Sequence, residues 1–225
     1  MHDLPTDRVN PRKASAPLVV GTISATRLRI WYRVLAAAAV GCALYVGPLF
    51  VLGVGAVLLL GRAYSVPPLR LKTRPGWDVA VNAFVVGVLA PAAGWSVTRA
   101  PWQFPWQIGL IGLLFAAALY VPTTVTDLAA DTEAGDTTFA VRFGRRVAYR
   151  LGVGLWAGAL VLCLWCAWRD VVVPRSTLVP QLVTVPVLLA AYAMLTRRPS
   201  IPRLAVVSVL FAVPTVGFAM AYIGA

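Results

Sequence analysis

Seven long apolar runs, separated by shorter polar stretches, dominate the hydropathy pattern of the chain. An α-helix needs about 20 residues to cross a bilayer, and most of the runs approach that length. We therefore predict membrane-spanning helices at residues 30–46, 49–63, 79–97, 108–125, 147–168, 178–195 and 204–223. The second run is somewhat short for a hydrocarbon layer of about 30 Å.

The polar stretches are expected to lie at the membrane surface. Residues 1–29 are polar and basic, and prolines interrupt them, which favours only short helical pieces. Residues 64–77 form a polar connection between the second and third runs. An acidic loop is expected directly after residue 125, where the fourth run ends.

The composition supports a membrane protein. The chain is 60% hydrophobic and 12% charged, whereas soluble domains carry about 25% charged residues. A core of this size cannot hide so many apolar residues, so lipid must contact much of the surface. The predicted fold class is all-α: one polytopic transmembrane helical bundle that comprises residues 1–225 as a single domain.

The distribution of basic residues predicts the orientation of the bundle. Seventeen of the 20 Lys and Arg residues fall on one side of the predicted topology, in the stretches 1–33, 61–77, 126–150 and 195–203. By the positive-inside rule this side is cytosolic, together with the N-terminus. The net charge of +12 therefore needs no nucleic-acid partner.

Four of the eight acidic residues follow the fourth apolar run: Asp127, Asp131, Glu133 and Asp136. The spacing of four places Asp127 and Asp131 on one face of a helix, where two carboxylates repel unless a cation lies between them. Hard oxygen ligands suit Mg²⁺, whose coordination is completed by water and substrate phosphates. The alternative is a solvated helix end, with Asp136 capping a turn.

Asp3 and Asp7 repeat the same spacing near the N-terminus, on the same side of the membrane. Pro5 between them makes a regular helix less favourable, and acidic residues at a chain end are usually solvated. Because it would be a second such pair on one membrane side, we predict that it contributes to the same metal site.

The connection between the second and third runs carries Arg70 and Lys72. Pro67 and Pro68 favour an extended backbone, which would project both side chains to one side. There they could clamp a diphosphate that Mg²⁺ already bridges. The alternative is that these charges serve only the positive-inside distribution.

Five further residues are candidates for lining a substrate pocket. Tyr64, Ser65 and Tyr120 lie at predicted helix ends on this side, and Arg142 adds a positive charge. Asn82 is polar within an apolar run, so it should face the bundle, either as structural glue or as pocket lining. With His2 as the only histidine, histidine-based catalysis has little support.

Two segments resemble the UbiA-type intramembrane prenyltransferases. They are YSVPPLRLKTRPG, residues 64–76, and DLAADTEAGDTTFAVRFG, residues 127–144. The first is similar to the family's YSxPPxRxK-like connection, and the second to its second Asp-rich motif. The order and spacing of these motifs agree over nearly the whole chain.

The resemblance is incomplete at the N-terminus, where the family's NDxxDxxxD motif would begin. HDLPTDRVNPRK supplies only its second half, with Asp3 and Asp7 as the second and third aspartates. The family usually has nine transmembrane helices, and the two not seen here would precede Asp3. We expect either a start codon assigned too late or a real truncation.

The resemblance implies Mg²⁺-dependent transfer of a prenyl group from a prenyl diphosphate to a lipophilic, often aromatic, acceptor within the membrane. Lys72 and Arg70 would stabilise the leaving diphosphate, and Tyr64 or Tyr120 would shelter the allylic cation. Three alternatives remain: an inactive homologue or assembly partner, a terpene cyclase of the same fold, and a transporter of anionic lipids.

Overall fold

In the computed structural model, which describes residues 4–10 and 13–223, every regular element is a helix. Six helices among these described residues are long and apolar enough to cross a membrane: Ala25–Val46, Pro48–Ser65, Trp77–Ser96, Trp106–Ala134, Phe139–Arg169 and Arg175–Thr196. The seventh predicted run lies in α9 (Ile201–Ile223), whose stretch Ile201–Val216 is apolar but shorter. The prediction of an all-α, polytopic membrane bundle is confirmed.

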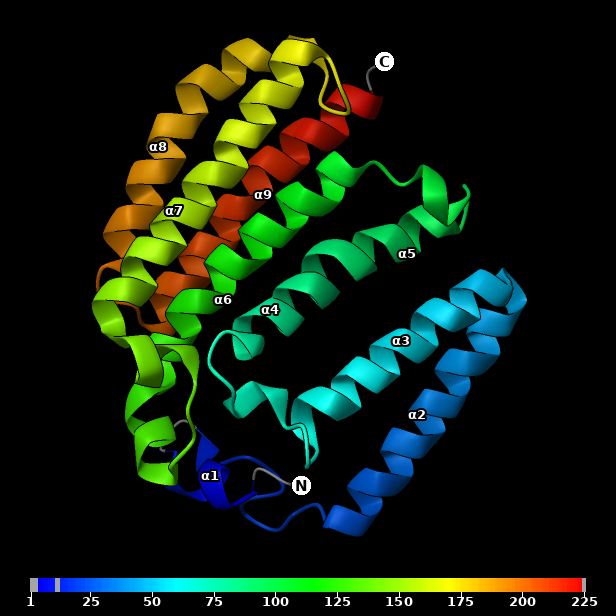
Figure 1. Ribbon diagram of the computed structural model, residues 1–225, viewed down its shortest axis with the longest axis vertical. Helices are drawn as coiled ribbons and strands as arrows, with labels where there is room; N and C mark the ends of the chain where they lie inside the picture. The colour runs from blue at the N-terminus through cyan, green and yellow to red at the C-terminus, as the bar shows by residue number, and fades with distance from the viewer. Residues whose placement is uncertain (1–3, 11–12, 224–225) are drawn as a thin grey trace.

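Helices α2 to α6 lie side by side in chain order, whereas the last helix, α9, returns to lie between α6 and α7 in the view of Figure 1. The short α1 (Leu4–Val9) contacts α6 (Trp106–Ala134), and α2 (Ala25–Val46) forms a hairpin with α3 (Pro48–Ser65). The third span consists of α4 (Trp77–Phe84), a π-helical segment (Val85–Leu89) and α5 (Ala90–Ser96). The remaining spans are α7 (Phe139–Arg169), α8 (Leu178–Thr196) and α9.

Helices α6 and α7 form the centre of the protein, and their mutual interface is the most extensive in the bundle. Trp156 on α7 stacks on Tyr192 of α8 with ring centroids 4.7 Å apart, and both side chains are fully buried. The Tyr192 hydroxyl donates to the carbonyl of Ala118 on α6 at 2.6 Å. This buried contact joins three helices and fixes the orientation of α6.

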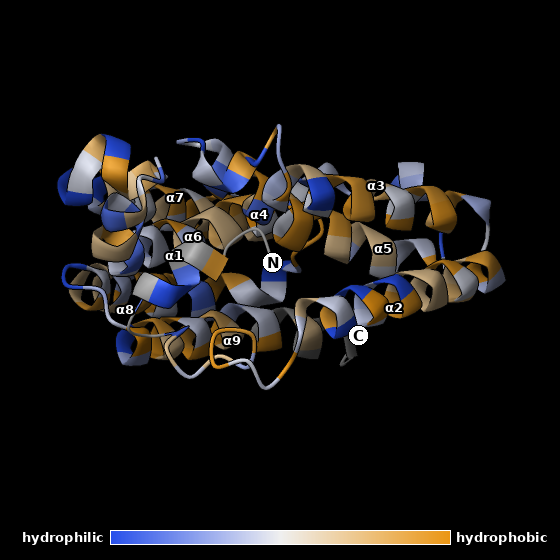
Figure 2. Ribbon diagram, turned by 90° about the horizontal axis from the view of Figure 1, so that it is seen from below, coloured by the Kyte–Doolittle hydropathy of each residue, from blue (hydrophilic) through white to orange (hydrophobic). Residues whose placement is uncertain are grey.

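The periphery is apolar and exposed, as a bilayer requires. Helices α2 and α3 bury almost none of their apolar residues, and large hydrophobic side chains are also exposed on α8 and α9. Figure 2 shows the hydrophobic residues along these helices. Closer to the centre, the backbones of Gly87 and Gly112 touch: a Cβ on Gly87 would lie 2.3 Å from the Gly112 carbonyl carbon. Small residues permit this close crossing of the π-helical segment and α6.

Three local predictions were wrong. The expected acidic loop after residue 125 is helical, because α6 continues to Ala134 and ends at Gly135 in a left-handed conformation (φ 72°). The backbone around residues 70–72 is not extended: Arg70 has a positive φ of 38° and Leu71–Thr73 form a turn of 3₁₀-helix. Helix α7 begins at Phe139 rather than residue 147, and its axis breaks at Gly144 (φ 80°, ψ 166°).

Candidate active site

A polar cavity of about 270 Å³ lies where the ends of α3, α4 and α6 meet α1. Most of the predicted site residues line it. Its lining comprises Asp7, Lys13, Tyr64, Ser65, Lys72, Thr73, Asp78, Tyr120, Thr123, Thr124, Asp127, Asp131, Asp136 and Thr138. The structure therefore brings together segments that are far apart in the sequence.

One stripe of α6 supplies five of these residues: Tyr120, Thr123, Thr124, Asp127 and Asp131. They recur at helical spacing, so all five lie on the same face. The hydroxyls of both threonines bond to carbonyls of their own helix, three residues back. As predicted, Asp127 and Asp131 lie on one face of a helix. The sequence analysis missed Thr123 and Thr124, although they follow the same helical periodicity.

Neighbouring polar groups position the two α6 carboxylates. The hydroxyl of Thr138 donates to Asp131 Oδ2 at 2.9 Å. The amide of Asn10, a buried residue after α1, lies 3.5 Å from Asp127 Oδ1. Both carboxylates therefore keep oxygen atoms at the cavity in defined orientations.

The N-terminal segment contributes one carboxylate and one ammonium group to the cavity. Lys13 Nζ donates to Asp7 Oδ1 at 2.6 Å. Asp7 lines the same cavity as Asp127 and Asp131, and its predicted part in a shared metal site stays a prediction. Asp3, the other member of the predicted N-terminal pair, lies outside the described residues.

The end of α3 and the connection to α4 supply another wall of the cavity. The hydroxyls of Tyr64 and Tyr120 lie 2.7 Å apart, which links the end of α3 to α6. Ser65 and Lys72 also line the cavity. Arg70, predicted as a diphosphate clamp, does not line it. Its guanidinium instead lies 3.4 Å from Asp136 Oδ1, at the end of α6.

Asp78 is a site residue that the sequence reasoning missed. It is 1% exposed and accepts hydrogen bonds from the backbone amides of Gly76 at 2.8 Å and Phe139 at 2.7 Å. It thereby ties the start of α4 to the start of α7, beside the α6 carboxylates. The sequence offered one signal, which is that this acid directly follows the basic connection.

Two other predicted residues are not brought to the cavity. Asn82 donates to the carbonyl of Asp78, four residues earlier on α4, at 2.9 Å. This hydrogen bond favours a structural role for Asn82 over the lining of a substrate pocket. Arg142 is exposed on α7, before the break at Gly144. A role for either residue in substrate binding stays a prediction.

The charges of the cavity favour a bound cation. Five lining carboxylates, those of Asp7, Asp78, Asp127, Asp131 and Asp136, are accompanied by the ammonium groups of Lys13 and Lys72. Among the described residues, no three acidic, histidine or cysteine side chains converge closely enough to enclose an ion by themselves. That arrangement fits Mg²⁺, which usually takes one or two carboxylates, several waters and substrate phosphates rather than an all-protein cage.

The chain shares its sequence pattern with known prenyltransferases. The family model of the UbiA prenyltransferase family matches residues 1–199. The chain is 27% identical over 174 residues to the homogentisate phytyltransferase of Synechocystis sp., an alignment that covers 74% of this chain and 56% of that protein. It is 32% identical over 169 residues to the probable homogentisate phytyltransferase 2 of Oryza sativa, with 69% and 42% covered.

The fold is also similar to that of solved structures. A UbiA homologue from Archaeoglobus fulgidus bound to DMAPP and Mg²⁺ superimposes with a TM-score of 0.70 at 22% identity, covering 98% of this chain and 78% of that one. The same homologue bound to GPP and Mg²⁺ gives a TM-score of 0.69 at 24% identity. The chain spans about half the length of the curated relatives that it matches.

Proposed function

Because the chain belongs to the UbiA prenyltransferase family, we propose that it transfers a prenyl group from a prenyl diphosphate to a lipophilic, aromatic acceptor within the membrane. The observation that carries this proposal is the joining of acidic and basic side chains in one cavity at the end of an apolar bundle. Relatives named as homogentisate phytyltransferases support an aromatic acceptor.

The proposed cofactor is Mg²⁺. Asp127 and Asp131 on α6 and Asp7 on α1 would hold it, with Asp136 and Asp3 as further candidates. When bound, the metal would neutralise negative charge on the diphosphate oxygens. The homologue structures with DMAPP or GPP and Mg²⁺ support this assignment.

The protein's own residues would act on the diphosphate and on the prenyl group. Lys72, with Lys13, places an ammonium group at the cavity, where it would bind diphosphate oxygens and stabilise the charge that develops as the allylic C–O bond breaks. Arg70 would act indirectly, by holding Asp136. The rings of Tyr64 and Tyr120, whose hydroxyls lie 2.7 Å apart, would face the allylic cation, which an aromatic surface stabilises.

We also propose that the site faces the cytosol. Among the residues that the structure describes, sixteen Lys and Arg residues belong to the end of the bundle that carries the cavity, and Arg99, Arg169 and Arg175 lie at the opposite end. The positive-inside rule then places the N-terminus and both Asp-containing segments on the cytosolic side. The partner lipids are those of the surrounding bilayer, and the basic loops need no nucleic acid.

The test is a transfer assay on membranes that contain the protein, a labelled prenyl diphosphate, Mg²⁺ and a panel of aromatic acceptors. Asp127→Asn and Asp131→Asn should each reduce transfer at least about a hundredfold, because each removes a metal ligand and the charge it supplies. Chelation of divalent ions should have the same effect.

Glu133→Gln is the matched control, because Glu133 is exposed at the end of the same helix and does not line the cavity. This variant should retain activity within about twofold. Full activity in both aspartate variants would refute the metal assignment. Absence of transfer from every prenyl diphosphate and acceptor by the unmodified chain would refute the function.

A further inference from the structure

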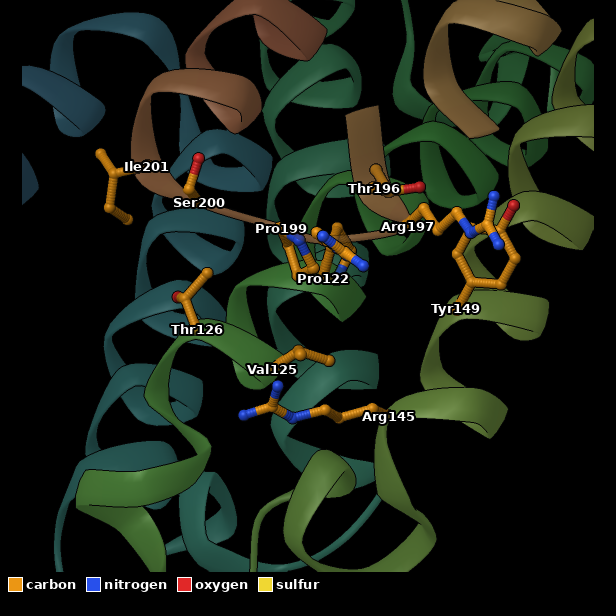
Figure 3. Close-up of a pocket in the computed structure, with 11 residues that line it drawn as sticks. Pro122, Val125, Thr126, Arg145, Tyr149, Thr196, Arg197, Pro199, Ser200 and Ile201 are labelled. Atoms are coloured by element: carbon orange, nitrogen blue, oxygen red, sulfur yellow. The ribbon is translucent and has the colours of Figure 1, made fainter. Parts of the chain in front are cut away.

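A second cavity, of about 550 Å³, lies on the opposite face of α6 from the candidate active site. Pro122, Val125 and Thr126 line it, and their positions on a helix point away from Thr124 and Asp127, which line the active-site cavity. Helix α7 and the connection between α8 and α9 form its other walls (Figure 3). One helix therefore separates two cavities at the same end of the bundle.

The two cavities have opposite electrostatic character. Arg145 on α7 and Arg197 and Arg198 after α8 line the second cavity, and its described lining contains no acidic residue. No ion pair joins any of these three guanidinium groups to the part of the chain that the structure describes. The carboxylates of the active-site cavity favour cations, whereas the three guanidinium groups at this cavity favour anions.

Apolar side chains line the cavity together with the guanidinium groups. Figure 3 shows Arg145 reaching from α7 to a position beneath Val125 in the view, while Arg197 and Tyr149 lie on the other side of the picture. Pro122 and Ile201 add further apolar surface. The volume lies within the range of small-molecule sites, about 300–1,000 Å³. The lining therefore fits an amphiphile, with an anionic group on the arginines and a hydrophobic part against the apolar side chains.

The position of the cavity indicates where such a ligand comes from. The spans α8 and α9 end and begin at Thr196 and Ile201, so the residues between them lie at the level of lipid headgroups. Basic pockets between transmembrane helices at this depth bind anionic headgroups. Arg145 and Arg197 are exposed enough for a headgroup to reach them from the surface.

We propose that this cavity binds the phosphate group of an anionic membrane phospholipid. The guanidinium groups of Arg145 and Arg197 donate to the phosphate oxygens, and the apolar lining contacts the glycerol and the first acyl carbons. The apolar lining favours a lipid over free phosphate, because free phosphate has no hydrophobic part and would leave the apolar side chains in contact with water. The bound lipid lies against the face of α6 opposite Asp127. Binding of the lipid at this cavity does not depend on whether the chain transfers prenyl groups.

The test compares retention of phosphatidylglycerol and phosphatidylcholine with identical acyl chains by the full chain in detergent, measured by native mass spectrometry. The unmodified protein should retain phosphatidylglycerol about tenfold more strongly. The double variant Arg145→Gln/Arg197→Gln should abolish this preference. The double variant Arg146→Gln/Arg150→Gln removes the same charge from exposed positions outside the cavity, so it should preserve the preference within about twofold.

Equal loss in both double variants would overturn the proposal, because general attraction to charge would then explain retention. Retention unchanged by the cavity variant would also overturn it. Ser200→Trp provides a test that keeps every charge: it should displace the lipid by filling the cavity. If inorganic phosphate alone raises the melting temperature as much as the lipid does, and no lipid is retained, the site binds a soluble anion and the lipid assignment fails.

Discussion

The carboxylate of Asp78 accepts hydrogen bonds from two backbone amides, those of Gly76 and of Phe139, which lies 61 residues further along the chain than Asp78. We predict that Asp78→Asn lowers the free energy of unfolding by about 1–3 kcal/mol. An amide group has one acceptor oxygen, so its NH₂ group would face one of the two donors. Thermal unfolding in detergent, followed by intrinsic fluorescence, measures the change.

Asp170→Asn provides the comparison for this prediction. Asp170 also accepts a backbone hydrogen bond, from Arg175 at 2.8 Å, but at an exposed position where water replaces a lost partner. Its left-handed backbone (φ 55°) suits asparagine as well as aspartate. The expected loss is below about 0.5 kcal/mol. Equal destabilisation by both substitutions would show that burial does not increase the contribution of the Asp78 hydrogen bonds to the free energy of unfolding.

The residues of the candidate site differ in how far the sequence could predict them. Asp127 and Asp131 were predictable because helical spacing alone puts both carboxylates on one face. The pairing of Tyr64 with Tyr120 and the role of Asp78 depend on contacts between distant segments, for which no local pattern exists. Arg70 was misplaced because two prolines favoured an extended backbone, whereas the chain turns there into a 3₁₀ segment.

At the scale of the helix, the break in α7 depends on one glycine. Gly144 has φ 80° and ψ 166°, a conformation that strongly favours glycine over residues with a Cβ. We predict that Gly144→Ala destabilises the protein by about 1–2 kcal/mol. It should also shift the segment that carries Phe139, whose amide binds Asp78. Thermal unfolding gives the first effect, and the affinity for a prenyl diphosphate analogue gives the second.

Gly154→Ala is the control on the same helix. Gly154 is exposed, has helical geometry, and a Cβ there would meet nothing within 4 Å. Alanine is the better helix former by about 1 kcal/mol, so this variant should be neutral or more stable. If both substitutions were tolerated equally, α7 would be able to straighten at Gly144 without loss, and the break would have no structural role.

The extents of the helices were harder to predict from the sequence than their existence. In the described part of the chain, a helical span lies at each predicted apolar run, because exclusion of water from the bilayer forces the backbone to satisfy its own hydrogen bonds. Helices α6 and α7 extend beyond the apolar runs, to Ala134 and back to Phe139. Hydropathy carries no signal there, because these polar turns lie outside the lipid and are stabilised by contacts with α1 and α4.

For the whole molecule, the distribution of charge over the two ends of the bundle favours a cytosolic cavity. The acidic cavity and most of the basic residues lie at the same end of the bundle, while Arg99, Arg169 and Arg175 lie at the other. Retaining many cations at one membrane face is favourable on the cytosolic side, where the leaflet is anionic. The same charges would concentrate a soluble diphosphate substrate near the cavity.

The orientation can be measured by labelling single cysteines with a membrane-impermeant maleimide in intact cells. We predict that Ser176→Cys, at the end of the bundle opposite the cavity, is labelled in intact cells. Glu133→Cys, at the exposed end of α6, should be labelled only after the cells are permeabilised. The unsubstituted chain gives the background, because Cys42, Cys163 and Cys166 lie within the spans, where a charged reagent does not penetrate. Labelling of Glu133→Cys in intact cells would place the cavity outside the cytosol, so that neither a cytosolic diphosphate nor the anionic leaflet could account for its basic surroundings.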